Sequence, residues 1–317
     1  MFGNQTSSVV EVPGIIMLGQ SHNDGVFQSE RLANTLWNYK GILTGYPNKR
    51  VSQEQYVADP AGVHIWNRSA AQASDWSVDS GAWEKYEAGV NSRNVVNGSN
   101  NVLFGCENFI AQGIIDEVGG EVAIIKPAFE GIGLLPTSTA VLPGPYNNVT
   151  KHIAVQTYIQ PAVRDWAAYN PGTRIKPVGV LWWQGEAENG AGTSGSAYVA
   201  DLLKLYTYMN EVFRSHFVLD RLPAWQFVSM DYYRNATENG INTAVEAFAD
   251  AREGCYFIDD HKGKSLQKQE LTLEQASPLA VGTPNASGND DNEHSNEIAG
   301  QLISERFVAN LVAGGYI

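Results

Sequence analysis

This sequence of 317 residues is poor in cysteine and in long apolar runs, and each shortage excludes a class of protein. Two cysteines, Cys106 and Cys255, are too few for a disulfide framework, and no C-x-x-C pair is present to bind a metal ion. We therefore expect two free thiols and no metal. No apolar run approaches the roughly 18 residues of a membrane span. The first residues also lack the basic and apolar segments of a signal peptide, which leaves a cytoplasmic, a trimmed secreted or a virion-associated protein open.

Positive charge is also scarce, since 21 Lys and Arg face 34 Asp and Glu and the net charge is −13. An acidic surface repels phosphate backbones and anionic lipids, which argues against nucleic acid and membranes as partners. Hydrophobic residues make up 43% of the chain, enough for a large core. We find no repeat and no linker, so we expect a single domain over residues 1–317, with an oligomer left open.

Short apolar runs bounded by turn residues predict buried strands, and helical patterns alternate with them. The predicted strands span 14–18, 121–126, 177–183, 224–230 and 255–258, and the predicted helices span 28–39, 108–118, 151–169, 196–218 and 296–313. The runs are apolar on nearly every residue, which is typical of parallel strands covered on both faces. We therefore predict an α/β fold, a three-layer α/β/α sandwich with a five-stranded parallel sheet. The stretch 43–100 has little periodicity and is expected to be a long loop-rich excursion over one end of the sheet.

Polar, turn-prone residues follow three of the predicted strands. GQSHN (19–23) follows the first, QGEAEN (184–189) follows the third, and the loop after the fifth ends in DDNEHS (290–295). Ligands of open α/β sheets bind at the carboxyl ends of the strands. We therefore expect the three segments to meet at one rim.

The residues at this rim suit acyl transfer. Ser21 is a candidate nucleophile, which needs a base to take its proton. His294 is the best-placed histidine, and Asp291 lies three residues before it, as an acid that orients the base. The backbone N–H groups of Ser21 and Gly105 and the side-chain amide of Gln184 are candidate donors to the oxyanion.

Four blocks in this order resemble the SGNH (GDSL-like) hydrolase superfamily. They are Gly19-Gln20-Ser21, Phe104-Gly105-x-Glu107, Trp183-Gln184-Gly185-Glu186 and Asp291-x-x-His294. The chain is more similar to the branch of sialate O-acetylesterases and carbohydrate-esterase acetylxylan esterases, over residues 14–307. The resemblance implies a flavodoxin-like fold, no cofactor, and a serine esterase that removes O-acetyl groups from an acetylated polysaccharide or sialic acid. It implies that Ser21 is the nucleophile and His294 the base, with Glu186 as a rival to Asp291 for the orienting acid.

The sequence departs from this branch directly after the nucleophile. His22 stands where the branch usually has asparagine, with Asn23 next. We expect both residues, together with Trp183, to contact substrate. Other tryptophans could either stack on sugar rings or pack in the core. The exception is Trp182, because the alternation of side chains along its strand assigns it to the core. These open cases are Trp66, Trp76 and Trp83.

Two further function classes stay open at this point. One is a non-catalytic carbohydrate-binding module on the same fold, as in a phage or surface assembly. The other is a lipid or thioester hydrolase. A fluorophosphonate labels Ser21 of a serine esterase but not of a binding module. Preference for acetyl over longer acyl chains distinguishes an acetylesterase from a lipid or thioester hydrolase.

Overall fold

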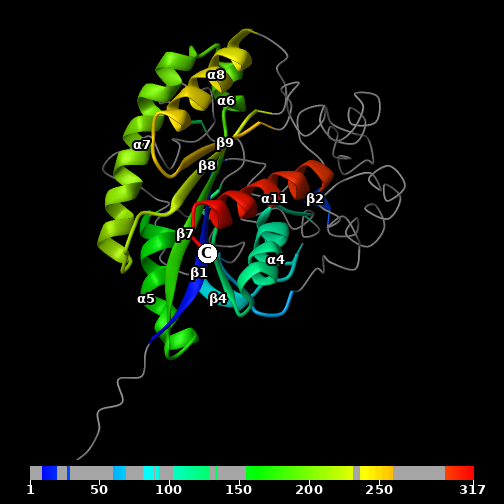
Figure 1. Ribbon diagram of the computed structural model, residues 1–317, viewed down its shortest axis with the longest axis vertical. Coiled ribbons are helices and arrows are strands. Elements are labelled where there is room, and N and C mark those ends of the chain that lie inside the picture. Colours follow the sequence, from blue (N-terminus) through cyan, green and yellow to red (C-terminus); the bar gives the residue numbers. More distant parts are fainter. Residues whose placement is uncertain are drawn as a thin grey trace, which may run out of the picture.

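The fold is given by a computed structural model that describes residues 9–19, 27–28, 60–68, 81–88, 90–92, 103–128, 133–134, 155–230, 236–259 and 297–317. Its strands are β1 (Val10–Gly19), β2 (Phe27–Gln28), β3 (Val63–Arg68), β4 (Gly81–Lys85), β5 (Leu103–Phe104), β6 (Val122–Ile125), β7 (Thr173–Trp183), β8 (Ala224–Val228) and β9 (Cys255–Ile258). Its helices are α4 (Glu107–Val118), the π-helix η2 (Val155–Ile159), α5 (Gln160–Tyr169), α6 (Glu186–Gly190), α7 (Gly195–His216), α8 (Ala236–Asp250) and α11 (Glu297–Ala313). Figure 1 shows these elements along the chain.

Seven of the strands form one mostly parallel sheet in the order β4-β3-β6-β1-β7-β8-β9. Within this sheet only β4 is antiparallel to its neighbour, and β2 and β5 pair antiparallel in a separate two-stranded sheet. The predicted α/β class and all five predicted strands are confirmed, as β1, β6, β7, β8 and β9. These five have the order β6-β1-β7-β8-β9, which is the flavodoxin-like order. The predicted count of five strands is wrong, because β3 and β4 extend the sheet beyond β6.

Both additional strands come from the stretch 43–100, which we expected to be loop-rich. β3 runs parallel to β6, and β4 returns antiparallel to β3 with Trp83 opposite Trp66. Trp83 is the buried residue of β4, and its indole N–H donates to the Ala162 carbonyl oxygen of α5 at 2.8 Å. β4 lies at the edge of the sheet, where a strand is covered on fewer sides, and β3 lies between β4 and β6. Polar residues interrupt the apolar pattern of both strands, so they escape detection as continuous apolar runs.

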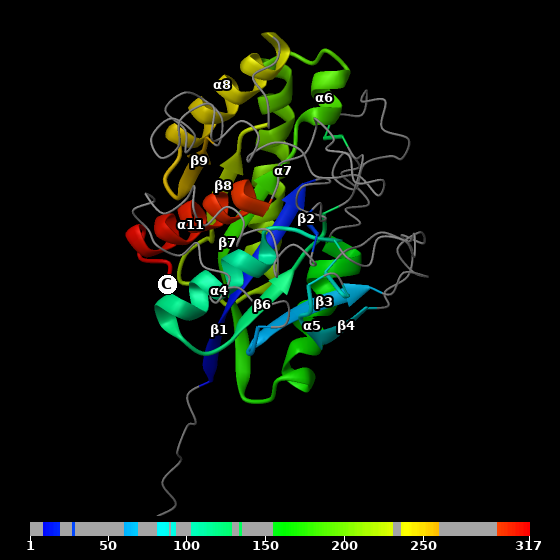
Figure 2. The ribbon, with the colours of Figure 1, turned by 90° about the vertical axis from the view of Figure 1, so that its right-hand side faces the viewer.

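Helices cover both faces of the sheet, as the three-layer prediction requires. Along β1, Ile15 and Met17 pack on the side of α4 and α11, whereas Ile16 and Leu18 pack on the side of α5, α7 and α8. Figure 2 shows α4 and α11 together on the near side of the sheet. Alternate side chains of a strand point to opposite faces, so one strand contributes to both halves of the core.

Most predicted helices are present with small shifts at their ends. They correspond to α4, to η2 with α5, to α7 and to α11, while α6 and α8 were not predicted. The predicted helix 28–39 lies outside the described residues, except that Gln28 ends β2. None of the described helices combines the length and the apolar composition that crossing a bilayer requires. Cys106 and Cys255 are both free thiols, as predicted.

Candidate active site

The carboxyl ends of β1 and β7 meet where the order of the strands reverses. Gly19 ends β1 and pairs with Trp183, which ends β7. Gly19 has φ 132°, and a Cβ atom there would lie 2.2 Å from the Trp183 carbonyl oxygen, so this close approach requires glycine. Such a switch point is where open α/β sheets bind ligands. Ser21 follows Gly19 by two residues and Gln184 follows Trp183 directly, so both chain segments leave the sheet at this edge.

The predicted nucleophile, its two neighbours, the base and one candidate acid lie outside the described residues. They are Ser21, His22, Asn23, Asp291 and His294. The structure does describe the elements that flank them. α11 begins three residues after His294, and the Ser304 hydroxyl of α11 donates to the Cys106 carbonyl oxygen at 3.4 Å. This contact places α11 beside the loop that contains Gly105.

Gln184 is the predicted site residue that the structure describes most completely. It is buried, and its side-chain Oε1 accepts a hydrogen bond from the Tyr198 hydroxyl at 2.7 Å. Its Nε2 donates to Glu188 Oε2. Contacts at both ends therefore hold the amide in one orientation.

Tyr198, on α7, connects this amide to the sheet. Its oxygen accepts from the Trp182 indole N–H at 3.0 Å, and its hydroxyl also lies 2.9 Å from the Gln184 backbone carbonyl oxygen. Burial raises the pKa of Tyr198 well above its usual value, and the negative charge of Glu188 raises it further. The phenol therefore keeps its proton and can donate to Gln184.

Two carboxylates follow Gln184, and the structure distinguishes them. Glu186, the rival orienting acid of the sequence analysis, is half-buried, although both of its carboxylate oxygens are buried. Glu188 is completely buried and contacts the Gln184 amide directly. Sequence reasoning did not select Glu188. The sequence carries no signal that separates it from Glu186, because the two carboxylates lie in the same polar segment and differ in burial.

Gly105 differs from the expectation that its N–H faces the oxyanion. In the structure this N–H donates to Glu107 Oε1 at 2.9 Å. Glu107 is the first residue of α4 and is completely buried. The Glu107 carboxylate lies only two residues further along the chain and accepts this hydrogen bond. The Gly105 N–H therefore points to a buried carboxylate.

Glu107 belongs to a buried cluster of charged and polar groups. The same Oε1 accepts from Lys126 Nζ at 3.1 Å and from the Tyr86 hydroxyl at 3.2 Å. Lys126 also donates to the Ser92 carbonyl oxygen. Burial, together with the Glu107 carboxylate, raises the pKa of Tyr86 well above its usual value. The cluster ties the loop before α4 to the end of β6 and to the segment after β4.

Trp183 is not placed to contact substrate, contrary to the expectation. Its side chain has no exposed surface and packs in the core on the side of α4 and α11. Trp182 is buried on the opposite face, as alternation predicted. Trp66 and Trp83 are core residues as well: the Trp66 indole N–H donates to the Thr157 carbonyl oxygen of η2, and the Trp83 indole N–H to the Ala162 carbonyl oxygen of α5. Trp76 lies outside the described residues.

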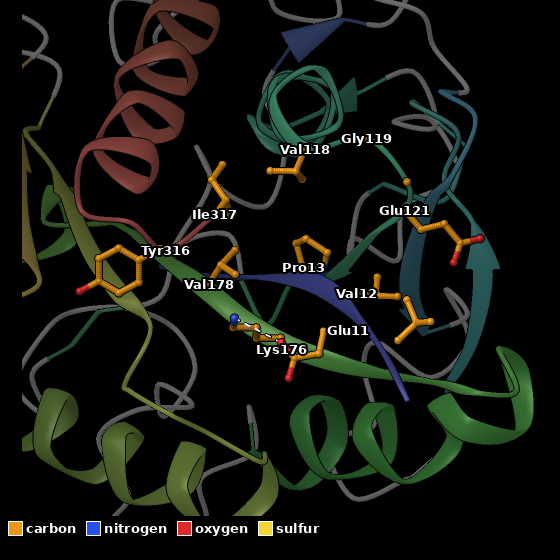
Figure 3. Close-up of a pocket in the computed structure, with 12 residues that line it drawn as sticks. Glu11, Val12, Pro13, Val118, Gly119, Glu121, Lys176, Val178, Tyr316 and Ile317 are labelled. Atoms are coloured by element: carbon orange, nitrogen blue, oxygen red, sulfur yellow. Dashed lines mark ion pairs between the residues drawn. The ribbon is translucent and has the colours of Figure 1, made fainter. Parts of the chain in front are cut away.

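A cavity of about 440 Å³ opens at the opposite edge of the sheet. It lies at the amino ends of β1 and β7, between the end of α4 and the end of the chain (Figure 3). Its charged lining includes Glu11 and Lys176, which form an ion pair at 3.3 Å. Within the part of the chain that the structure describes, no group of three His, Cys, Asp or Glu residues is placed to hold a metal ion. The cavity is separate from the edge that carries Gly19 and Gln184.

No protein-family model matches this chain, and neither does any curated protein sequence. Among solved structures, a protein from Arabidopsis thaliana is similar, with a TM-score of 0.51, 16% identity, and 94% of this chain and 98% of that chain covered. A carbohydrate acetylesterase from Xanthomonas citri gives a TM-score of 0.48 at 12% identity, over 94% of this chain and 55% of that one. A family two carbohydrate esterase from Clostridium thermocellum, in complex with cellohexaose, gives a TM-score of 0.42 at 12% identity, over 96% of this chain and 65% of that one.

This chain thus spans about half the length of the Xanthomonas citri enzyme and under two thirds of the Clostridium thermocellum one. The likeness to the Arabidopsis thaliana protein extends over nearly the whole of both chains. At this identity it concerns the fold alone.

Proposed function

We propose that this chain is a serine esterase that removes O-acetyl groups from a carbohydrate. The observation that carries the proposal is the pairing of Gly19 with Trp183 at the switch point of the sheet. It brings Gly19, the residue with which the GQS block begins, and the WQGE block to one edge, where ligands of such sheets bind. The buried amide of Gln184 adds a fixed hydrogen-bond donor there.

The reaction follows from the chemistry of these groups. The Ser21 hydroxyl oxygen attacks the acetyl carbonyl carbon while His294 takes its proton. The negative charge that develops on the carbonyl oxygen is stabilised by the Ser21 N–H and by an N–H of Gln184. The sugar hydroxyl then leaves with the proton held by His294, and Ser21 keeps the acetyl group as an ester.

Hydrolysis of this acetyl-enzyme repeats the same proton transfers. Water gives a proton to His294 and attacks the acetyl carbon, and acetate leaves as Ser21 recovers its proton. Asp291 is the proposed acid that orients His294, with Glu186 as the alternative. His22 and Asn23 follow the nucleophile directly and are proposed to contact the substrate. The mechanism needs no metal ion and no organic cofactor.

Two residues have changed roles relative to the sequence analysis. The Gly105 N–H donates to Glu107, so the proposed oxyanion donors are now the groups of Ser21 and Gln184. Trp183 supports the site from the core and is not proposed to stack on a sugar.

Rates of acetyl-ester hydrolysis test the proposal. We expect the chain to hydrolyse p-nitrophenyl acetate and to release acetate from at least one of a panel of acetylated polysaccharides and sialic acids. Ser21→Ala should lower kcat by on the order of 10⁶, and Gln184→Ala by about 10² to 10³. Ser215→Ala is a matched control, since this exposed hydroxyl near the end of α7 donates to the Glu211 carbonyl oxygen.

Three outcomes would contradict the proposal. Activity of Ser21→Ala near that of the wild-type chain would exclude the serine mechanism. Glycan binding without any hydrolysis would indicate a binding module. Preference for long acyl chains over acetyl would indicate a lipid hydrolase.

A further inference from the structure

The Gln184 amide has no orientation of its own, because the oxygen and nitrogen ends of an amide have nearly the same shape. Only one end can donate to a negatively charged oxygen. A carbonyl oxygen turned toward the oxyanion would repel it, whereas an NH₂ group would stabilise it. Whatever decides between the two ends therefore decides whether Gln184 can contribute to the proposed reaction.

Glu188 is placed to make this decision. Its carboxylate is completely buried. Both of its oxygens accept hydrogen bonds from N–H groups, so the end of the Gln184 amide that faces it is the NH₂ group. Glu188 Oε2 accepts from Gln184 Nε2, and Oε1 accepts from the backbone N–H of Leu134, in the segment that follows β6. The carboxylate is thus held by two loops of the same sheet edge.

Tyr198 supports the same orientation from the other end of the amide. The indole N–H of Trp182 can only donate, and it occupies a lone pair of the Tyr198 oxygen at 3.0 Å. The Tyr198 proton then points to the Gln184 oxygens, with Oε1 at 2.7 Å. Donor and acceptor roles along the chain Trp182–Tyr198–Gln184–Glu188 are therefore consistent with one another.

We propose that Glu188 is a positioning residue that fixes the Gln184 amide with its NH₂ group toward the developing oxyanion. The inference rests on the proposed function. The NH₂ group carries two hydrogens: Glu188 accepts one, and the proposed reaction assigns the other to the oxyanion. Glu188 itself does not touch the reacting atoms. Its effect is preorganisation, because the donor needs no reorientation when charge develops.

The first test is Glu188→Gln, which keeps the size of the side chain. The new amide has an NH₂ group in place of one of the two accepting oxygens, so either Gln184 Nε2 or the Leu134 N–H faces a donor. We expect kcat for p-nitrophenyl acetate to fall about 10- to 100-fold, with KM changed by less than about threefold. If Glu188 only added negative charge near the oxyanion, it would destabilise the transition state. Removal of that charge in Glu188→Gln would then raise kcat, and this result would contradict the inference. Glu211→Gln, on the exposed face of α7, is the matched control.

The second test asks whether Glu188 acts through Gln184. In the Gln184→Ala background, Glu188→Gln should lower kcat by less than about twofold, because the amide that it positions is gone. A merely structural role predicts the same fold loss in both backgrounds and would overturn the inference. Tyr198→Phe provides a second variant that removes the other contact and keeps the aromatic ring. Its kcat loss should also disappear in the Gln184→Ala background.

A third measurement does not depend on activity. The two side-chain N–H protons of Gln184 can be followed by NMR in ¹⁵N-labelled protein and assigned with Gln184→Ala. We expect a widely separated, slowly exchanging pair in the wild-type chain and a collapsed or shifted pair in Glu188→Gln. If the wild-type chain cleaves no acetyl ester but the pair responds in this way, the proposed function fails while the fixed amide stands. An unchanged pair overturns the positioning role whatever the activity.

Discussion

Replacement of Lys126 by methionine is the sharpest test of the buried cluster behind the candidate site. Lys126 is 1% exposed, and its Nζ lies 3.1 Å from the Oε1 of Glu107, which has no exposed surface. Methionine has a similar length and volume but no charge, so the variant leaves the Glu107 carboxylate buried without its cation. Removal of one partner of a buried ion pair costs about 3 to 5 kcal/mol. We expect the free energy of unfolding of Lys126→Met to fall by this amount.

The expected change is large enough for a thermal scan. For 317 residues, the entropy of unfolding near 60 °C corresponds to about 0.7 kcal/mol per degree. A loss of about 3 to 5 kcal/mol then lowers Tm by about 4 to 8 °C. Urea denaturation, which gives the free energy directly, should agree in size. Lys204→Met is the matched control: Lys204 pairs with Asp201 on α7 with its side chain 75% exposed, and we expect a change under about 1 kcal/mol.

A double variant identifies the cause of the loss. If the unpaired carboxylate is responsible, addition of Glu107→Gln to Lys126→Met should recover at least about half of the lost stability. Two results would refute this reasoning. One is a loss of less than about 1 kcal/mol in Lys126→Met, and the other is a further loss in the double variant that equals the cost of Glu107→Gln alone.

Two other predictions concern the ends of the sheet. Gly19→Ala should lower the free energy of unfolding by about 2 kcal/mol or more, because φ is 132° and the added Cβ would lie 2.2 Å from the Trp183 carbonyl oxygen. Gly119→Ala is its control, with φ 71° but nothing within 4 Å of the Cβ, and should cost about 1 kcal/mol in urea denaturation. Burial lowers the pKa of His64 despite the Glu121 carboxylate 3.5 Å away. The unfolded chain therefore binds more protons than the folded one just below pH 6.5, so stability should decrease as pH falls through this range. His64→Gln should flatten that part of a stability profile measured between about pH 5 and 7.5, and an unchanged slope would contradict the role of His64.

The central part of the fold could be predicted from sequence because its strands are buried on both faces. The run 255–258 matches β9 to the residue, and 14–18 lies within β1. The edge was missed for a physical reason: in β4 only Trp83 is buried, and charged residues follow it. Such a strand is stabilised by its contacts with β3 and α5. These contacts involve residues distant in the sequence, so the pattern of the strand's own residues does not reveal them.

The candidate site divides in the same way. Gln184 could be selected from sequence, because its chemistry and its place after a strand point to an oxyanion donor. Glu188 could not be separated from Glu186, because burial distinguishes them and burial depends on α7 and on the segment after β6. The Gly105 N–H was misassigned because the competing acceptor, Glu107, reaches back by a side-chain rotation that sequence spacing does not specify.

The most direct test of the proposed activity is the reaction of the folded chain with a fluorophosphonate, followed by peptide mapping of the adduct by mass spectrometry. An activated serine at the exit of β1 predicts one adduct per chain, located on Ser21. The adduct should be absent after denaturation and absent in Ser21→Ala. Lack of any adduct in a folded chain, or an adduct at another residue that persists in Ser21→Ala, would contradict a nucleophile at this edge of the sheet.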